Sequence, residues 1–503
     1  MFAAERSVTR TWPDDPEHRE LLERPRTGLF TEQSVDEGQF ALDHGPFDRY
    51  RRTVHTTPDG LTETTTYRLL IPWFGWLFSL PVRWNVARRG RADRMPVWAP
   101  PDRLDARQAR VLGLLAAAAM ASAFTNTLFT QTATFAADSF GVGDAGVGWG
   151  GAIVRAGIVI AIPLGSLADR AGRRIVIRVV AWAAPLVCAL GALAPSFPLL
   201  VATQTLGRPL GLVLDLLIAV VAAEEMPRSS RAYAISVMAM ASGLGAGIAV
   251  MALPLADLDI GPGGDEGWRF VYVVTLLWLL VAVSVSRHLP ETARFTRPHV
   301  VRPPIDRRRL VLVAATLICG NFFIAPASFF QNRYLNDVRG LSATMVAVFT
   351  LCTATPAALG LVVGGRLADL HGRRRLIAGA IPIATGALVV SFTVAGPAMW
   401  AGAFVGGFVG GIAYPALAVY RAELFPTGNR GRANGWLTAS ALGGGILGIL
   451  LVGQLADRDV PYSQAIGLVA LGQLVVVVLV LTRFPETAHR SLEELNPEDS
   501  QDA

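Results

Sequence analysis

The chain has 503 residues, of which 52% are hydrophobic and only 17% charged, and its formal net charge is +6. Soluble domains carry about 25% charged residues, so this composition excludes an ordinary water-soluble enzyme and favours a membrane protein. The arginines form short clusters between apolar runs and no continuous basic face, so nucleic acid is not an expected partner. Cys188, Cys319 and Cys352 stand alone inside apolar runs, so neither a metal site nor another cofactor is expected.

Residues 1–105 form a polar extension with no signal-peptide pattern, and we expect it to be cytoplasmic. Its first 45 residues are expected to be disordered because they are strongly polar. Alternating Thr and Val around Pro58-Asp59-Gly60 predict a short β-hairpin. The Trp-rich run 69–84 is too short and too broken by prolines to span a membrane, so it predicts a segment lying in the membrane surface. An ordinary packed core of a small domain is the alternative.

Twelve apolar runs follow, each near the length of about 20 residues that a membrane-spanning helix needs. They predict an all-α membrane protein of twelve transmembrane helices in two six-helix bundles, residues 106–288 and 310–483. The expected spans lie near residues 110–135, 147–168, 175–194, 197–222, 231–255, 267–287, 310–331, 343–366, 375–395, 397–420, 431–453 and 462–482.

Arginine placement predicts the orientation of these spans. The loops after even-numbered spans are rich in arginine, and the loops after odd-numbered spans contain few. Because cytoplasmic loops carry the positive charge, both termini are expected in the cytoplasm of a multi-pass cell-membrane protein. Residues 289–309, rich in proline and arginine, are interpreted as a cytoplasmic linker, and residues 484–503 as a cytoplasmic tail.

Three charged phrases occur once in each half of the chain and in the same order. "GSLADRAGRR" begins at Gly165 and "GRLADLHGRR" at Gly365, 200 positions later. "EEMPRSSRA" is matched by "AELFPTGNRG", and "LPETARF" by "FPETAHR". This repetition indicates an internal duplication of a six-span unit in which both copies cross the membrane in the same direction.

The repeated charges predict a latch on the cytoplasmic side of the membrane. The loop acid can face the positive N-terminal end of a neighbouring helix, and the loop arginines can pair with the glutamates of the other two phrases. A topology signal with a solvated surface is the alternative. The residues assigned to this gating network are Asp169, Arg173, Glu225, Arg231, Glu291, Asp369, Arg373, Glu423, Arg430 and Glu486.

Over about residues 106–495 these phrases resemble the loop signatures of the major facilitator superfamily, and the "P-E-T" phrases look like those of its sugar and metabolite porters. The resemblance implies a secondary transporter that works as a monomer, in which the gating network holds the outward-facing state. Span 7 lacks the Gln-Gln-x-x-Gly-x-Asn phrase of sugar porters, and span 5 lacks the Gly-Pro phrase of drug/proton antiporters. A proton-coupled metabolite symporter is therefore favoured.

Ionisable residues deep inside the expected spans are candidates for the substrate site, because such groups are costly in a bilayer unless they face a cavity. Arg155 lies in span 2, and Arg208 and Asp215 lie seven residues apart on one face of span 4. The arginines can bind a carboxylate or phosphate, and the aspartate can bind and release a proton. A permanent Arg–Asp pair with a purely structural role is the alternative.

Uncharged polar residues in spans 1, 7 and 10 complete the candidate site. Asn126 and Asn321 occupy corresponding spans of the two halves, and Tyr414 in span 10 can hydrogen-bond a ligand. Gln131 lies with Asn126 in span 1, whereas Gln331 and Asn332 of span 7 lie near an outer end, where an interfacial role is the alternative. Tyr420 can also hydrogen-bond a ligand, and anchoring at the membrane interface is its alternative.

The sequence thus predicts a secondary active transporter that moves a small organic solute, with an anion favoured, by alternating access and proton symport. Proton-driven efflux of drugs or metabolites is one alternative, and a membrane-bound sensor that signals through residues 1–105 is another. The chain has no lysine and therefore no nucleotide-binding P-loop, so ATP-driven transport is not expected. No catalytic triad pattern is present, and enzymatic activity is not expected. The expected partners are the solute, protons and the lipid bilayer.

Overall fold

The computed structural model describes residues 5–87, 99–100, 102–161, 163–164, 167, 172–227, 230–261, 265–290, 305–425 and 430–487. Within this part of the chain, eleven helices are long and apolar enough to cross a membrane. The expected second span begins as α4 (Asp144–Ala156) and continues as the 3-10 turn η2 (Gly157–Ile160), after which several residues lie outside the described set. The predicted membrane architecture of two six-helix bundles is confirmed.

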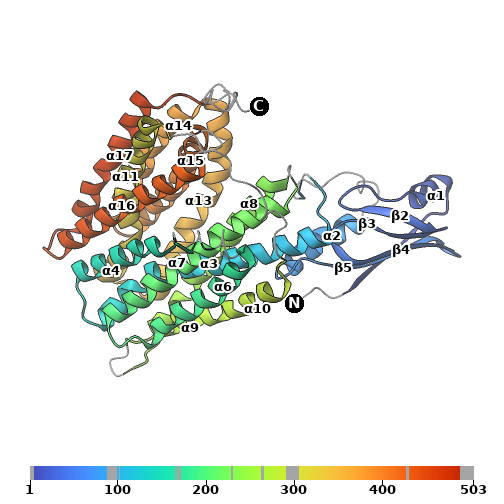
Figure 1. Cartoon of the computed structure of the whole chain (residues 1–503), viewed down its shortest axis with the longest axis horizontal. Helices are drawn as coiled ribbons and strands as arrows, with labels where there is room; N and C mark the ends of the chain where they lie inside the picture. Colours follow the sequence, from blue (N-terminus) through green and yellow to red (C-terminus); the bar gives the residue numbers. More distant parts are fainter. Residues whose placement is uncertain are drawn as a thin grey trace.

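Each bundle keeps its helices in the expected order (Figure 1). Besides α4 and η2, the first bundle contains α3 (Ala106–Ser139), α6 (Arg173–Ala189), η3 (Leu190–Leu193), α7 (Phe197–Glu225), α8 (Arg231–Met251), η5 (Leu253–Asp257), α9 (Trp268–Val274), η6 (Thr275–Trp278) and α10 (Leu279–His288). The second contains α11 (Arg307–Phe329), α12 (Gln331–Arg333), η7 (Tyr334–Val338), α13 (Ala343–His371), α14 (Arg373–Ser391), α15 (Pro397–Glu423), α16 (Arg430–Ala456) and α17 (Tyr462–Arg483).

Each bundle has a close helix–helix contact at a glycine, and the two glycines occupy matching places in the duplicated unit. A Cβ on Gly245 of α8 would lie 2.1 Å from the carbonyl oxygen of Met120 in α3, and one on Gly444 of α16 would lie 2.3 Å from that of Ile318 in α11. Only glycine permits backbones to approach so closely. The glycine-rich stretches of the fifth and eleventh spans therefore serve helix packing.

Among the described residues, the contacts between the two bundles gather toward one end of the structure. Gly148 in α4 packs against the backbone of Ile449 and Gly453 in α16, and η5 packs against the start of α13. Figure 1 shows α4 directly beneath α16 at this end, while the extension projects from the opposite side. No hydrogen bond or ion pair between described residues joins the bundles at that opposite side. The conformation is therefore closed at the loops that follow odd-numbered spans.

The expectation of disorder over residues 1–45 is wrong for the described residues 5–45. They contain one helix and the first three strands of the chain. These strands belong to a five-stranded antiparallel sheet with the order β1-β5-β4-β3-β2. The expected hairpin is only the β4–β5 pair of this sheet. The elements are β1 (Arg6–Trp12), α1 (Pro16–Glu23), β2 (Thr31–Asp36), β3 (Gln39–His44), β4 (Phe47–Thr57) and β5 (Gly60–Leu69).

A buried network of charges explains why such a polar sequence folds. The Arg52 guanidinium donates to Glu32 at 3.0 Å and to Glu63 at 3.4 Å, and Arg26 donates to Glu63 at 2.8 Å. All four side chains are at most 5% exposed. Burial raises the pKa of the Tyr50 phenol well above its ordinary value, so the phenol stays protonated and donates to Glu32. Charges that suggest disorder in the sequence are here paired inside the domain.

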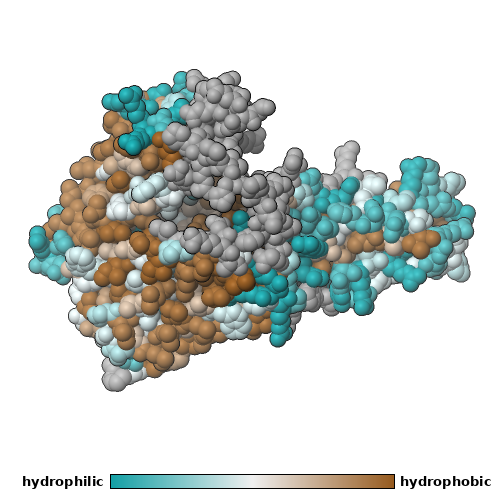
Figure 2. Space-filling model, in the orientation of Figure 1, coloured by the Kyte–Doolittle hydropathy of each residue, from teal (hydrophilic) through white to brown (hydrophobic). Residues whose placement is uncertain are grey.

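The Trp-rich run folds as α2 (Gly75–Ala87), whose two faces have different partners. Val82 and Val86 pack with Phe47 and Leu69 in the core of the sheet. Trp76, Leu80 and Trp84, spaced four residues apart, remain exposed on the other face. Figure 2 shows the hydrophilic sheet projecting beyond the hydrophobic helical body. The α2 helix therefore combines both expectations, because one face is domain core and the other is an exposed aromatic face.

We predict that Glu32→Gln destabilises the sheet of the extension. The substitution leaves a buried guanidinium without its full countercharge, which costs about 3 kcal/mol. Hydrogen exchange of the amides of β2 to β5, measured on the full chain, should accelerate by about a hundredfold. The matched control is Glu20→Gln, since the Glu20–Arg24 pair is exposed and contributes about 0.5 kcal/mol or less. Equal exchange in the two variants would contradict a structural role for the buried network.

Candidate functional site

Arg208 is held at the middle of α7 by close packing on both sides. A Cβ on Gly211 would lie 2.5 Å from the Thr125 hydroxyl oxygen, and Ser122 donates to the Gly211 carbonyl at 2.7 Å, which fixes α7 against α3. On another face of α7, a Cβ on Gly157 would lie 2.6 Å from the Thr205 carbonyl oxygen. Arg208 lies on α7 between these two contact lines.

Arg155 reaches the boundary between the two bundles from the last turn of α4. Its Nη1 atom is 3.3 Å from where a Cβ on Gly445 of α16 would lie, and the backbone oxygen of Asn321 in α11 is 3.9 Å from the same point. A residue larger than glycine at position 445 would therefore crowd the guanidinium. Arg208 lies within electrostatic range of Arg155. Two guanidinium groups thus share one region of the membrane interior.

Neither arginine has a counterion among the residues that the structure describes. Within the described residues, Arg155 and Arg208 form no ion pair and no hydrogen bond, and the Nε atom of Arg208 is buried. A buried charge without a partner is strongly unfavourable in the membrane interior. Two such charges together make a site that an anion would stabilise, because carboxylates and phosphates accept charge-assisted hydrogen bonds from guanidinium groups.

Asp215 does not pair with Arg208, so the structure contradicts the alternative of a permanent structural pair. Asp215 is exposed, and among the described residues it forms no ion pair. It lies seven residues beyond Arg208, or about 10 Å along the same edge of α7, toward the side where the bundles are apart.

Three uncharged candidates occupy different surroundings. The Asn126 side chain donates to Ser122 at 3.3 Å and its oxygen lies beside Gly211, one turn from Arg208, so it belongs to the arginine region. Asn321 donates to the Leu317 carbonyl at 3.1 Å and lies on the opposite side of that region. Tyr414 of α15 is 62% exposed. The structure does not bring Tyr414 to the two arginines.

Tyr420 and Arg421 are adjacent residues of α15 that both contact other helices or segments of the second bundle. Tyr420 is buried and donates to the Pro485 carbonyl at 3.1 Å, so it is neither a ligand residue nor an interfacial anchor. Arg421, which the sequence analysis did not single out, is close to Tyr414 and donates to the Thr438 hydroxyl of α16 at 2.8 Å.

An outer cluster around Arg333 joins the bundles at their closed end. Arg333 in α12 pairs with Asp144 at 2.9 Å and with Asp337 at 2.7 Å, and it also pairs with Asp138 at the end of α3. Tyr462 of α17 donates to the same Asp144 carboxylate at 2.8 Å. This cluster was not predicted from the sequence. The one available signal was that Arg333 follows the expected seventh span, in a loop where few arginines occur.

Two neutral contacts reinforce the same closed end. The buried Asn332 side chain donates to the Gln131 side chain of α3 at 3.0 Å, so these residues connect the bundles and are not merely interfacial. Asp257 at the end of η5 accepts from the backbone N–H groups of Ala343 and Thr344, both at 2.7 Å, at the N-terminus of α13. A carboxylate at a helix N-terminus is favoured by the helix dipole.

The expected gating network on the other side is only partly within the described residues. Asp169 and Glu291 lie outside them. The backbone alone is described for Arg231, Asp369, Glu423 and Arg430. Gly172 and Gly372, which belong to the repeated loop phrases, precede α6 and α14 with φ of 97° and 86°, a backbone conformation that favours glycine.

The described members of this network show two departures from expectation. Glu486 accepts from the backbone N–H groups of Arg373 and Arg374 at 3.0 and 3.1 Å. This glutamate of the "P-E-T" phrase therefore lies at the N-terminus of α14. The acid of the loop phrase was expected at such a helix end. The Arg373 guanidinium donates to Thr487 at 2.6 Å. Glu225 pairs with Arg107 of α3 at 3.3 Å, whereas loop arginines were expected as its partners.

Comparisons with known proteins agree with this architecture. A family model described as Major Facilitator Superfamily matches residues 114–355 and 310–500. The fosmidomycin resistance protein of Escherichia coli is 26% identical over 249 residues, 47% of this chain and 59% of that protein. The cis,cis-muconate transport protein of Acinetobacter baylyi is 26% identical over 226 residues, 41% of this chain and 54% of that protein. The matches thus span little more than half the length of these curated relatives.

The fold is also shared with solved structures of transporters. The crystal structure of a D-xylose-proton symporter matches with a TM-score of 0.65 and 15% sequence identity, over 75% of this chain and 98% of that chain. At this identity the similarity concerns the arrangement of helices.

We predict that Arg333→Gln weakens closure of the outer end. The variant removes the charge-assisted contacts of one guanidinium, about 2 kcal/mol, and leaves three carboxylates to repel one another. The population of outer-open molecules should then rise by about thirtyfold. Spin labels on Leu193→Cys and Ala395→Cys, in a chain whose native cysteines are replaced, should report longer distances by pulsed electron resonance.

The control for this measurement is Arg458→Gln, which removes an exposed arginine from the loop between α16 and α17. Distances in this control should match those of the parent chain. An unchanged distance distribution in Arg333→Gln would contradict the assignment of the outer cluster as a latch.

Proposed function

The chain belongs to the Major Facilitator Superfamily, whose members are transporters and not enzymes, and from this premise we propose that it carries a small organic anion across the cell membrane. The transport is secondary and proceeds by alternating access, with symport of protons. Both termini and the extension face the cytoplasm, and one chain suffices for function.

The pair of unpartnered guanidinium groups carries this proposal. Arg155 and Arg208 lie in the membrane interior beside the boundary of the bundles, and no described residue neutralises either of them. A solute with a carboxylate or phosphate would replace the missing counterion, and amide groups such as that of Asn126 would orient its uncharged part. A neutral solute would leave both charges without partners.

Two further observations support an anion and its route. The matched relative from Acinetobacter is named for transport of cis,cis-muconate, which is a dicarboxylate. In the conformation described here, the bundles are joined at the outer end and separate on the side of the extension. The anion site would then be reached from the cytoplasm in this state and from outside once the outer cluster opens.

Asp215 is the proposed proton-binding residue. It is exposed and lies on the same edge of α7 as Arg208. Its carboxyl group would exchange protons with the accessible solution, and its charge would affect binding of an anion nearby. The repeated charges from Asp169 to Glu486 are the proposed cytoplasmic gate, which the Glu486–Arg373 contacts support in the second bundle.

Efflux is the second candidate, because another matched relative is named a fosmidomycin resistance protein. The two directions are separated by untargeted mass spectrometry of the medium of cells that express the chain or its Asp169→Asn/Arg173→Ala variant. Solutes depleted only by the parent chain mean import and identify the solute class. Solutes enriched outside mean efflux and overturn symport.

We predict that Arg208→Gln selectively impairs transport of anions. Loss of one charge-assisted contact with the solute should lower kcat/KM by about ten- to a hundredfold. The measurement is uptake of labelled cis,cis-muconate, or of the solute identified in the medium, into proteoliposomes. Arg178→Gln is the matched control, because Arg178 in α6 donates to the Ser286 carbonyl at 2.8 Å, away from the site. Equal losses in both variants would remove the argument for an anion site at Arg208.

We predict that Asp215→Asn uncouples transport from the proton gradient. Without a titratable group at this position, an inward proton gradient should no longer accelerate uptake, whereas exchange of labelled for unlabelled solute should continue. Both rates are measured in the same proteoliposomes with and without the gradient. If the variant still responds fully to the gradient, Asp215 is not the coupling residue.

A further inference from the structure

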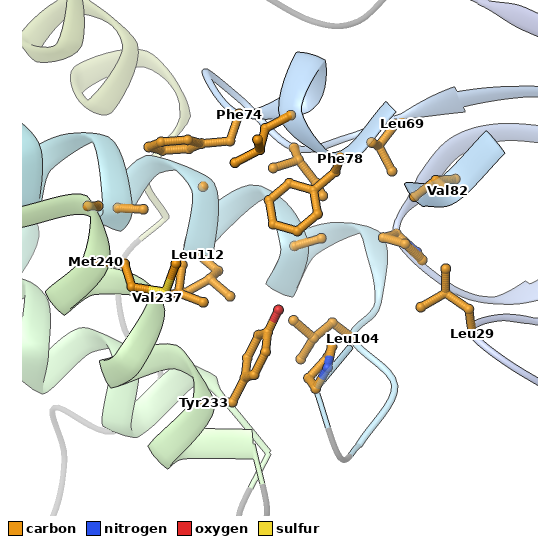
Figure 3. Close-up of a pocket in the computed structure, with 18 of the residues that line it drawn as sticks. Leu29, Leu69, Phe74, Phe78, Val82, Leu104, Leu112, Tyr233, Val237 and Met240 are labelled. Atoms are coloured by element: carbon orange, nitrogen blue, oxygen red, sulfur yellow. The ribbon is translucent and has the colours of Figure 1, made fainter. Parts of the chain in front are cut away.

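A hydrophobic pocket lies where the extension meets the first bundle. It has a volume of about 140 Å³. Its walls come from the end of β5 and loops of the sheet, from the α2 region, from the segment just before α3, and from α3 and α8. Figure 3 shows Phe74 and Phe78 of the α2 region opposite Val237 and Met240 of α8. Apolar cavities of about this size exclude water and accept small hydrocarbon groups.

The pocket opens onto the outer surface of the bundle. Met240 and Leu244 line it and are 71% and 54% exposed, and Met251, farther along the same face of α8, is 65% exposed. Met251 lies near the end of α8 where the two bundles meet, yet it remains uncovered. This face of α8 therefore points toward the bilayer and not into the space between the bundles, so the pocket is continuous with the lipid-facing surface.

The extension is fixed at the same depth as the start of α3. A Cβ on Gly113 would lie 2.8 Å from the Pro72 ring, so the beginning of the Trp-rich run rests on the second turn of α3. The exposed Trp76 and Trp84 of α2 are side chains that prefer the headgroup level of a bilayer. The pocket is thus located where the acyl chains of one leaflet begin.

Arg103 provides a positive charge at this pocket. Its Nε atom donates to the Gly28 carbonyl at 2.8 Å, and its Nη2 atom donates to the Thr27 carbonyl. These carbonyls orient the guanidinium but do not neutralise it, and no described carboxylate pairs with it. The Tyr233 hydroxyl points into the pocket in Figure 3 and adds a second polar group.

We propose that this pocket binds one acyl chain of an anionic phospholipid, whose phosphate is held by Arg103. The lipid would lie between the extension and α3 and α8, so it would stabilise their attachment. This inference rests on the apolar lining, on the opening to the bilayer and on the Arg103 charge, which no described carboxylate neutralises. It does not depend on which solute the protein carries.

The test is photolabelling of the purified full chain in nanodiscs that contain phosphatidylglycerol with a diazirine in its acyl chain. Crosslinks are expected on the α8 peptide that includes Val237 and Met240. Val237→Trp should reduce this labelling by about tenfold, because excluding even two methylene groups from the pocket removes that much affinity. Ile235→Trp is the matched control, since Ile235 is an exposed residue of α8 outside the pocket. Equal labelling of the two variants would overturn the proposal.

A second comparison tests the headgroup. The parent chain should be labelled more strongly by the phosphatidylglycerol probe than by the same probe built on phosphatidylcholine. Arg103→Gln should abolish this preference, and Arg103→Lys, which keeps the positive charge, should retain it. If Arg103 served only to dock the extension, both variants would lose its bidentate hydrogen bonds and would behave alike. Equal labelling of the parent chain by both probes would overturn the assignment of Arg103 to the phosphate.

Discussion

An unpaired charge in the interior of a bilayer is costly, and this constraint organises the whole membrane part of the protein. At the outer end, Arg333 is surrounded by carboxylates, and at the other end Glu486 receives the N-terminal N–H groups of α14. At the middle level, Arg155 and Arg208 have no counterions among the described residues. The carboxylate contacts at the two ends stabilise the structure itself, whereas the charges at Arg155 and Arg208 are the ones for which we proposed a ligand.

The same contacts explain which motions the fold permits. At the closed end the bundles are held by glycine-mediated packing of α4 on α16 and by the outer cluster. At the open end, the described bonds of Arg373, Glu486 and Glu225 all lie within one bundle. Each bundle therefore keeps its own internal contacts, and exchange between states requires breaking only the contacts between bundles.

The sequence predicted the features that depend on neighbours in the chain. Span lengths, arginine-rich loops and the duplicated phrases are local patterns, and the two-bundle fold followed from them. The Arg333 cluster could not be predicted in this way, because Asp138, Asp144 and Tyr462 come from distant segments that meet only after the bundles close. The extension was misjudged for the same reason, since Arg26 and Glu63 look like solvent-exposed charges until the sheet pairs them.

The duplication also shows where the two halves have diverged. The α4 and α7 helices of the first bundle contain Arg155, Arg208 and Asp215, whereas their counterpart α15 has no charged residue before Arg421 and α13 has none before Arg366. The second bundle instead presents a glycine, Gly445, to the Arg155 guanidinium. An anion held by these arginines would therefore be bound mainly by the first bundle, and the second bundle would move past it. In such an asymmetric site, the small side chains of α16 matter because they leave room for the charge as the bundles change their relative orientation.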